Sequence, residues 1–205
     1  MKLRSESFAD GGPIPARCAF GKPGDPVALS DNRTPHLAWR EAPHATQSFV
    51  LTCIDVDVPS DELDEITRPG EHFGFPYCHE GDVLDPQFGQ GKHCSDYVPP
   101  VLKLGAHVAA LGMRFYTGRQ FPSAYHGAIL IAEHGSWNRS KKSGYRVMTV
   151  RLRGNKVLAY QPLVTGFEQN EQAWGRPVDV QPLPDGSVLV SDDLAGAVYR
   201  ITYAP

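Results

Sequence analysis

Two stretches of this 205-residue chain repeat the same order of residue types, and this repeat constrains the fold more than any other feature. Residues 127–133 (GAILIAE) are followed by 144–147 (GYRV), and residues 186–192 (GSVLVSD) are followed by 196–201 (GAVYRI). Each unit is a turn, an apolar strand, a polar loop and a second strand. Units of about four short strands that cover each other's apolar faces are typical of β-propeller blades. The sequence therefore predicts an all-β fold, with a β-sandwich as the alternative because two repeats do not exclude it.

The composition agrees with short strands joined by many turns. Hydrophobic residues make up 41% of the chain and charged residues 21%, which is enough to bury a core in one or two domains. The 20 glycines and 18 prolines are scattered between apolar runs, and no helical periodicity of useful length is present. The net charge of -3, with both signs interspersed, offers no basic face for nucleic acid or anionic lipid.

Localisation and redox state can be addressed from the apolar runs and the four cysteines. No apolar stretch approaches the roughly 20 residues that span a bilayer, and the first residues lack the apolar core of a secretory signal, so we expect a cytosolic protein. No C-x-x-C pair occurs, which argues against a zinc ribbon or a thioredoxin-type motif. Cys78 and Cys94 flank a polar loop and could form a disulfide in an oxidising compartment. Cys18 and Cys53 lie in apolar surroundings and are expected to be buried thiols.

The character of the chain changes near residue 60. Before it, strands are predicted at residues 36–39 and, more strongly, at residues 48–55. An acidic run follows at residues 61–65, and then a long polar segment extends to Pro100. We therefore place a domain boundary at residue 60 or 61, which divides the chain into residues 1–60 and 61–205.

The first 60 residues resemble the opening of bacterial phosphatidylethanolamine-binding (kinase-inhibitor-like) proteins. The resemblance rests on residues 8–15 (FADGGPIP), 32–39 (NRTPHLAW) and 48–59 (SFVLTCIDVDVP). In that family acidic residues of the last segment edge an anion pocket, and Asp55 and Asp57 would hold those places. The family's downstream His-Trp and Gly-x-x-Arg segments have no counterpart here, and carboxylates alone repel an anion. A pair of strand-end aspartates that make turn hydrogen bonds is therefore the expected role.

Residues 61–205 resemble the C-terminal part of PQQ-dependent sugar dehydrogenases of the sorbosone/glucose dehydrogenase family. Several long motifs occur in the family's order: residues 61–63 (DEL), 73–79 (FGFPYCH), 107–118 (HVAALGMRFYTG), 132–139 (AEHGSWNR), 174–179 (WGRPVD) and 191–193 (SDD). The resemblance implies a six-bladed propeller with PQQ and calcium on its axis. This chain would hold two to three of those blades, an incomplete propeller preceded by a short partial β-module.

PQQ carries three carboxylates, so a site for it needs fixed cations. By resemblance, Arg176 contacts the cofactor, while Val178 stands where some relatives have a second arginine. The alternative is a surface arginine paired with Asp179 or Asp193. In the polar loop after residue 133, Arg139 would be a second clamp, Trp137 a stacking surface and His134 a hydrogen-bond donor. The alternative for this loop is a hydrogen-bonded corner with a structural role.

Two further positions complete the predicted site. His107 matches a cofactor-lining position, although a histidine at a strand end is more often hydrogen-bonded to backbone carbonyls. Glu62 matches an acidic residue near the family's calcium, with Asp61 as its companion. The alternative for this acidic pair is a solvated turn at a domain joint.

The resemblance implies oxidation of an aldose or aldehyde sugar by hydride transfer to PQQ, assisted by a histidine base. In the family that base lies in N-terminal blades, which the first 60 residues replace here, so no catalytic residue is assigned. We interpret the chain as a fragment or fusion of such a dehydrogenase with weak or lost activity. The alternative is a non-catalytic interaction module that associates with itself through open sheet edges.

Overall fold

The computed structural model describes residues 2–9, 15, 17, 21–22, 28–29, 38–40, 60–137, 139–154 and 156–204. The chain separates into two compact units, Met1–Gln47 and Ser48–Pro205. The predicted boundary at residues 60–61 falls inside the second unit, and it stays a prediction because residues 48–59 are outside the described residues. The predicted strand at residues 48–55, the aspartates Asp55 and Asp57, and the cysteines Cys18 and Cys53 also lie outside them.

The described part of the first unit consists of two short antiparallel pairs. Strand β1 (Lys2–Arg4) pairs with β4 (Ala38–Arg40), and β2 (Gly21–Lys22) pairs with β3 (Ala28–Leu29). The strand predicted near residues 36–39 is thus found as β4.

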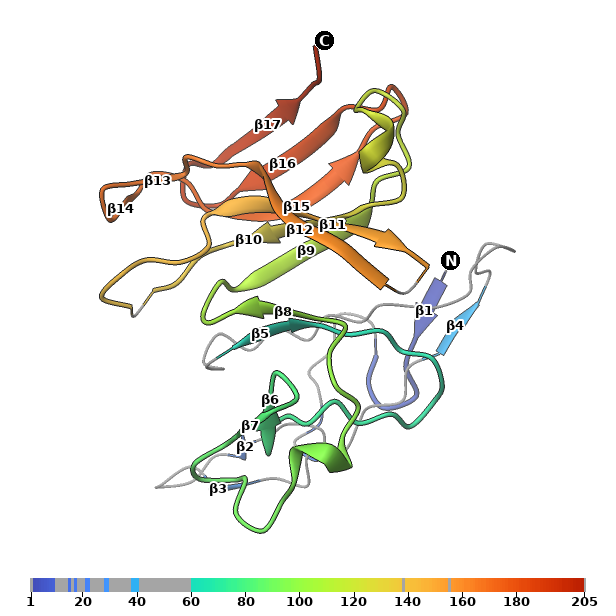
Figure 1. Cartoon of the computed structure of the whole chain (residues 1–205), viewed down its shortest axis with the longest axis vertical. Helices are drawn as coiled ribbons and strands as arrows, with labels where there is room; N and C mark the ends of the chain where they lie inside the picture. The colour runs from blue at the N-terminus through green and yellow to red at the C-terminus, as the bar shows by residue number, and fades with distance from the viewer. Residues whose placement is uncertain are drawn as a thin grey trace. The chain divides into compact units, whose positions relative to one another are not determined.

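The second unit is a succession of antiparallel sheets without an α-helix among its described residues, so the all-β prediction is confirmed there. The strands are β5 (Asp61–Leu63), β6 (Cys78–His79), β7 (Val83–Leu84), β8 (Leu102–Gly105), β9 (Ala110–Phe115), β10 (Ile129–Glu133), β11 (Arg146–Arg153), β12 (Lys156–Val164), β13 (Glu168–Gln169), β14 (Gln172–Ala173), β15 (Pro177–Pro182), β16 (Val188–Asp192) and β17 (Ala197–Ile201). Figure 1 shows the pair β5–β8, the four-stranded meander β9–β12 and the three-stranded meander β15–β17 as successive layers.

The two repeats of the sequence become corresponding parts of the two meanders. The first repeat forms β10 and β11, and the second forms β16 and β17, each pair in antiparallel register. Gly127 and Gly186 precede the first strand of each repeat with φ of 73° and 87°, a left-handed conformation that favours glycine. The repeat thus predicted four strands at nearly correct positions.

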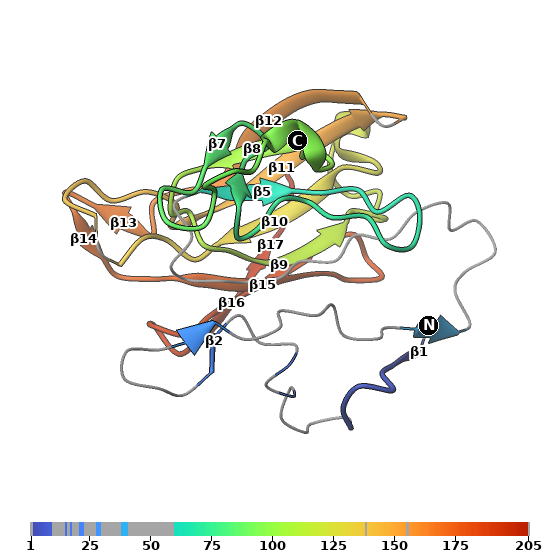
Figure 2. The ribbon, with the colours of Figure 1, turned by 90° about the horizontal axis from the view of Figure 1, so that it is seen from below.

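The core lies in two layers on opposite faces of the middle sheet. Successive residues of β10 alternate between them: Ile129 and Ile131 contact one cluster, and Leu130 and Ala132 contact the other. One cluster joins the middle sheet to β5 and β8; its buried members are Leu63, Leu104, Val108, Ile129, Ile131, Met148 and Val150. The second joins it to the last sheet; its buried members are Tyr116, Phe121, Leu130, Ala132, Val147, Val180, Val188 and Val190. Figure 2 shows the strands of this unit from below.

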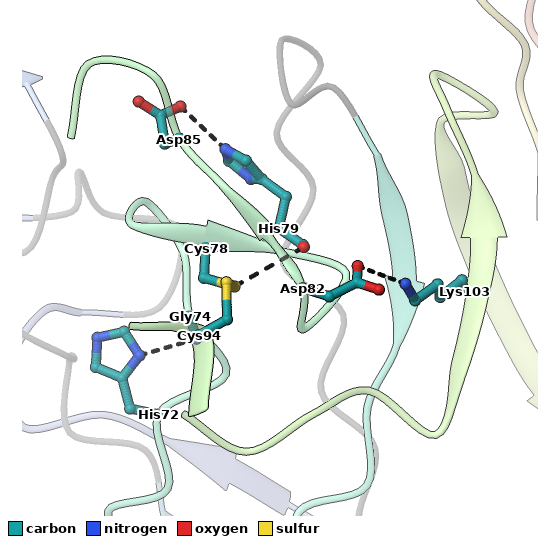
Figure 3. Close-up of a disulfide and its surroundings, with 8 residues drawn as sticks. All are labelled: His72, Gly74, Cys78, His79, Asp82, Asp85, Cys94 and Lys103. Atoms are coloured by element: carbon teal, nitrogen blue, oxygen red, sulfur yellow. Dashed lines mark hydrogen bonds and ion pairs between the residues drawn. A yellow bond between two sulfur atoms is a disulfide. The ribbon is translucent and has the colours of Figure 1, made fainter. Parts of the chain in front are cut away.

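A disulfide holds the long segment between β5 and β8. Cys78, which is buried in β6, is bonded to Cys94, with the two Cα atoms 5.5 Å apart (Figure 3). The neighbouring His79 Nε2 lies 3.0 Å from Asp85 Oδ2, and Lys103 of β8 pairs with Asp82 at 2.5 Å. The pairing left open by the sequence is therefore formed in the structure, whereas the cytosolic location stays a prediction.

Candidate functional site

Three segments of the chain meet at one corner of the second unit. They are the turn between β8 and β9, the loop after β10 and the residues at the start of β15. The turn between β8 and β9 accepts hydrogen bonds from the loop after β10: His134 N donates to Ala109 O at 2.9 Å, and Gly135 N donates to Val108 O at 2.9 Å. Gly135 lies so close to the Tyr145 ring that a Cβ on it would be 2.5 Å from ring atoms, and its φ is 100°. A side chain is therefore excluded at this position, and the loop packs tightly against its own return.

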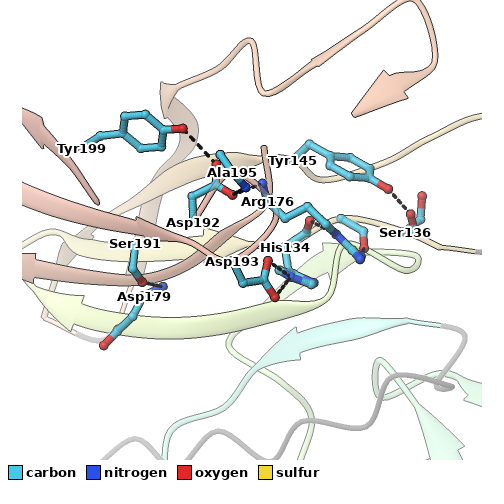
Figure 4. Close-up of polar contacts among 11 residues, drawn as sticks. His134, Ser136, Tyr145, Arg176, Asp179, Ser191, Asp192, Asp193, Ala195 and Tyr199 are labelled. Carbon is cyan, nitrogen blue, oxygen red and sulfur yellow. Dashed lines mark hydrogen bonds and ion pairs between the residues drawn. The ribbon is translucent and has the colours of Figure 1, made fainter. Parts of the chain in front are cut away.

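Arg176 reaches into this corner from the start of β15 (Figure 4). Its guanidinium donates from Nη2 to Gly135 O at 2.9 Å and from Nε to His134 O at 3.4 Å, and it lies over the Tyr145 ring at 5.8 Å. Asp179, considered as a partner for Arg176, instead accepts a hydrogen bond from Arg114 at 3.4 Å. Arg176 thus joins the third segment to the other two through backbone carbonyls.

His134 is paired with a carboxylate from the neighbouring sheet. Its Nε2 lies 3.0 and 3.1 Å from the two oxygens of Asp193, which fixes the ring orientation and favours the tautomer with hydrogen on Nε2. The hydrogen bond from His134 lowers the pKa of Asp193, and the positive charge of Arg176 acts in the same direction. Asp193 therefore belongs to the site as the partner of His134 and not as a direct partner of Arg176.

Asp192 supports the site through hydrogen bonds. The sequence analysis included it in the motif at residues 191–193 but assigned it no role. It is buried, and Oδ1 accepts hydrogen bonds from Arg176 N at 3.0 Å and Ala195 N at 2.9 Å, while Oδ2 accepts one from Tyr199 OH at 3.2 Å. The signal in the sequence was the paired aspartate after an apolar strand, in which the first aspartate continues the buried face of β16.

Arg139 and His107 lie where the loop after β10 meets the turn before β9. Arg139 Nη1 donates to Ala106 O at 3.1 Å, next to His107, which has a φ of 56° in the turn before β9. Ser143 Oγ also donates to Ala106 O, at 3.0 Å. Trp137, by contrast, is 63% exposed on the loop that carries Arg139. The structure thus brings His107, Arg139, His134 and Arg176 to one region, from three segments of the chain.

The two predicted calcium ligands have different surroundings. Asp61 accepts hydrogen bonds from the backbone amides of Ala109 and Ala110, both at 3.2 Å, and thereby braces the turn that carries His107. Burial raises the pKa of Asp61, while these amides lower it. Its oxygens are therefore used in holding the corner together.

Glu62 belongs to a second acidic cluster, with Asp64 and Glu80. Each of these three residues has one buried carboxylate oxygen without a hydrogen-bond partner in the described part of the chain. Burial, followed by the charge of Asp64, raises the pKa of Glu62 to about 7, and burial raises the pKa of Asp64 to about 6. Yet no group of three or more His, Cys, Asp or Glu side chains within the described ranges is arranged to hold a metal ion.

Beneath the corner, the middle sheet contains a buried charged network. Glu133, at the end of β10, accepts a hydrogen bond from Arg146 Nε at 2.7 Å and a short one from Tyr160 OH. Burial raises the pKa of Glu133, whereas both partners lower it. This network fixes the end of the strand from which the loop with His134 leaves.

Two family models match the chain over overlapping parts. The TrAA12-like model matches residues 52–204, and the phosphatidylethanolamine-binding protein model matches residues 4–79. The described residues contain no helix that is both long enough and apolar enough to span a membrane.

Curated relatives agree with both matches. An uncharacterized protein of Borreliella burgdorferi is 38% identical over 151 residues, which cover 72% of this chain and 40% of the relative. The pyrroloquinoline quinone-dependent pyranose dehydrogenase of Coprinopsis cinerea is 29% identical over 169 residues, with 73% and 22% covered. Protein YbhB of Escherichia coli is 45% identical over 60 residues, with 29% and 36% covered. The chain therefore spans less than half the length of each of these relatives.

Solved structures show the same fold for the C-terminal part. The calcium structure of the Trichoderma reesei carbohydrate-active enzyme of family AA12 matches with a TM-score of 0.58 at 20% identity, over 71% of this chain and 43% of that one. The holo form of the pyranose dehydrogenase PQQ domain from Coprinopsis cinerea matches with a TM-score of 0.54 at 23% identity, over 71% and 44%. At this level of identity the likeness concerns the fold alone.

Proposed function

The chain belongs to the TrAA12-like family over residues 52–204, and from that premise we propose that it is part of a PQQ-dependent sugar oxidoreductase. Its stacked sheets are two to three blades of an incomplete propeller, and its first 60 residues are a partial module of the phosphatidylethanolamine-binding type. The corner formed by His107, His134, Arg139 and Arg176 is its cofactor-binding region.

The observation that supports this proposal is the set of contacts between the three segments that carry His107, His134, Arg139 and Arg176: Gly135 N donates to Val108 O, Arg139 Nη1 to Ala106 O and Arg176 Nη2 to Gly135 O. The donor types fit a cofactor with three carboxylates, because arginine binds carboxylates through paired N–H groups. Arg176 uses Nε and Nη2 on backbone carbonyls, which holds the guanidinium in place but leaves fewer donors for a ligand. His134 is held by Asp193, and the exposed Trp137 ring lies on the same loop for stacking.

When bound, PQQ supplies a quinone that accepts a hydride from the sugar. The chain's own residues bind and orient: Arg176 and Arg139 supply positive charge, and His134, whose Nε2–H is held by Asp193, presents Nδ1 as a hydrogen-bond acceptor in a fixed orientation. Among the described residues, no contact identifies a base that would remove the proton from the sugar's hydroxyl group. We therefore expect oxidation of glucose or sorbosone to be weak or absent in this chain.

The described residues do not provide the set of calcium ligands that the family resemblance predicts. Asp61 is engaged by backbone amides, and the unpartnered oxygens of Glu62, Asp64 and Glu80 do not form a set of ligands around one point. Calcium coordination by Asp61 and Glu62 thus stays a family-based prediction, and no step of the function proceeds through it here.

Equilibrium dialysis with PQQ tests the cofactor-binding region directly. We expect saturable binding by the purified chain and a loss of about tenfold or more in affinity for Arg176→Ala. Arg114→Ala is the matched control, because Arg114 pairs with Asp179 on β15 and lies outside the corner. Binding that is unchanged in Arg176→Ala, or robust dye reduction with glucose or sorbosone, contradicts the respective part of the proposal.

A second candidate function is a non-catalytic interaction module. It is favoured by the last strand, β17, which pairs on one side only among the described residues and exposes 65% of Val198.

A further inference from the structure

Trp174 presents a rigid aromatic surface just before Arg176. Its ring is 50% exposed, although its indole Nε1 donates to Gly166 O at 2.6 Å. The ring stacks on buried Phe167, with centroids 5.4 Å apart and an interplanar angle of 30°, and it meets the Tyr199 ring edge-on at 6.4 Å. Because the polar N–H is used internally, the ring offers solvent an apolar face in a fixed orientation.

The hairpin that links Phe167 to Trp174 carries polar side chains at every position except Ala173. Residues 168–172 (EQNEQ) comprise two carboxylates and three amides, and all but the first are exposed. The two central residues, Asn170 and Glu171, have φ of 54° and 61°, as a tight two-residue hairpin turn requires. These side chains offer the carboxylate and amide groups that pair with hydroxyls.

The hairpin is anchored and does not project freely. Glu171 Oε2 accepts a hydrogen bond from Lys142 N at 2.6 Å, which joins the tip to the loop that carries Arg139. Glu168 in turn accepts a hydrogen bond from Glu171 N. Figure 1 shows β13–β14 extending on the same side of the unit as the loop that follows β10.

Asp192 connects this aromatic surface to the proposed cofactor corner. Its two oxygens accept hydrogen bonds from Arg176 N and from the hydroxyl of Tyr199, the residue that contacts the Trp174 ring. Trp174 is two residues from Arg176, so the rigid ring and the guanidinium are presented by one short, braced segment.

We propose that Trp174 is the platform of a carbohydrate subsite, on which the C–H face of a pyranose ring stacks while hairpin carboxylates and amides bind its hydroxyls. The assignment of this subsite to a substrate rests on the proposed function. The binding itself requires only the platform and its polar fringe, and therefore does not require PQQ.

The test measures sugar binding by the full chain without PQQ. Binding is detected by isothermal titration calorimetry and by saturation-transfer NMR. The probes are D-glucose and maltotriose, with the open-chain polyol sorbitol as the ligand control. We expect saturable binding of the ring sugars only, a loss of about tenfold or more in Trp174→Ala, and substantial retention in Trp174→Phe. Phe115→Ala is the matched protein control, because Phe115 is 47% exposed on β9 and belongs to neither proposed site.

The outcomes separate this inference from the proposed function. Absence of saturable sugar binding by the unmodified chain, equal binding of sorbitol, or unchanged binding by a folded Trp174→Ala overturns the platform. Sugar binding by a chain that fails to bind PQQ supports the platform and contradicts the cofactor proposal. Trp174→Phe keeps an aromatic ring on Phe167, and the circular dichroism spectrum and thermal unfolding of Trp174→Ala establish whether its loss of binding occurs in a folded chain.

Discussion

Glu62 has one buried carboxylate oxygen, Oε2, without a hydrogen-bond partner among the described residues. Burial and the charge of Asp64 raise its pKa from 4.5 to about 7, so the folded chain holds this proton more tightly than the unfolded chain. The resulting stability is fully present below pH 4.5 and is lost as pH rises through about 7. We expect Glu62→Gln to flatten this decline and to raise the free energy of unfolding above pH 7 by about 1 kcal/mol, after allowance for partial solvent exposure.

Chemical denaturation across this pH range checks the prediction. Asp64→Asn should act in the same direction over a lower range, because the pKa of Asp64 is about 6. An unchanged pH profile in both variants would mean that neither carboxylate is desolvated as the structure indicates.

Asp192 and Asp193 are adjacent, yet their substitutions should have unequal effects on stability. Asp192→Ala leaves two backbone amides and the Tyr199 hydroxyl without their acceptor, at a cost of about 2–3 kcal/mol. Asp193→Ala removes an exposed partner of His134 and should cost less than about 1 kcal/mol. Urea unfolding of the two variants measures the difference, and equal losses would contradict the supporting role given to Asp192.

Motif resemblance singled out Arg176 and His134 as candidate site residues but did not predict the contacts that hold them. The partners of these side chains are 42 and 59 residues away in sequence, across a boundary between two sheets. Such pairings depend on how the sheets stack, which local residue patterns do not specify. The same reason explains why Glu62 and Asp61, neighbours in sequence, have different partners.

At the scale of elements, the predictable strands were those buried on both faces or repeated in sequence. All five residues of β10 are buried, so it reads as a continuous apolar run. Strand β12 is largely exposed or half-buried and contains Pro162, and β5 pairs with β8 across about 40 residues of intervening chain. Neither leaves a periodic signal that identifies its partner.

The first strands of the two meanders, β9 and β15, approach closely at Gly112 of β9. A Cβ at this position would lie 2.5 Å from Asp179 Cα on β15, so the backbones themselves would have to separate. We expect Gly112→Ala to lower the free energy of unfolding by about 1–3 kcal/mol and to loosen the contact between the sheets. Thermal unfolding measures the loss.

Gly154→Ala is the comparison for that variant, because Gly154 has a φ of 58° but open space around it. It should cost only about 1–2 kcal/mol of backbone strain, without loosening the sheet contact. Hydrogen exchange of β9 and β15 amides distinguishes the two, and equal exchange in both variants would contradict the close approach.

The disulfide is the covalent restraint on the segment between β5 and β8. Cys78 and Cys94 are 16 residues apart, and closing a loop of this size stabilises the folded state by about 3 kcal/mol in the chain-entropy account. A paired Cys78→Ala and Cys94→Ala variant, or the reduced chain, should therefore unfold at lower denaturant concentration. Identical unfolding of the oxidised and reduced chains would contradict a stabilising bond.

At the scale of the whole molecule, the stacking of sheets explains how one unit brings loops of different sheets together without closing into a barrel. Each sheet of the second unit buries a face against its neighbour, and the corner with Arg176 forms where the ends of adjacent sheets meet. The arrangement also leaves a last sheet whose outer strand, β17, has one unpaired edge among the described residues. Its backbone groups are available to pair with another strand.

Val198 makes this edge a candidate for self-association. It is 65% exposed as the second residue of β17, and nearby Leu194 is 53% exposed. We expect sedimentation velocity to show association that grows with concentration, because an apolar edge strand pairs with a second copy. Val198→Lys should shift the chain to the monomer, since a charge on the edge opposes strand pairing, whereas Val83→Lys, at a valine that is 47% exposed on β7, should not. A monomer at every concentration, or equal effects of the two lysines, would remove both the β17 interface and the main support for the interaction-module function.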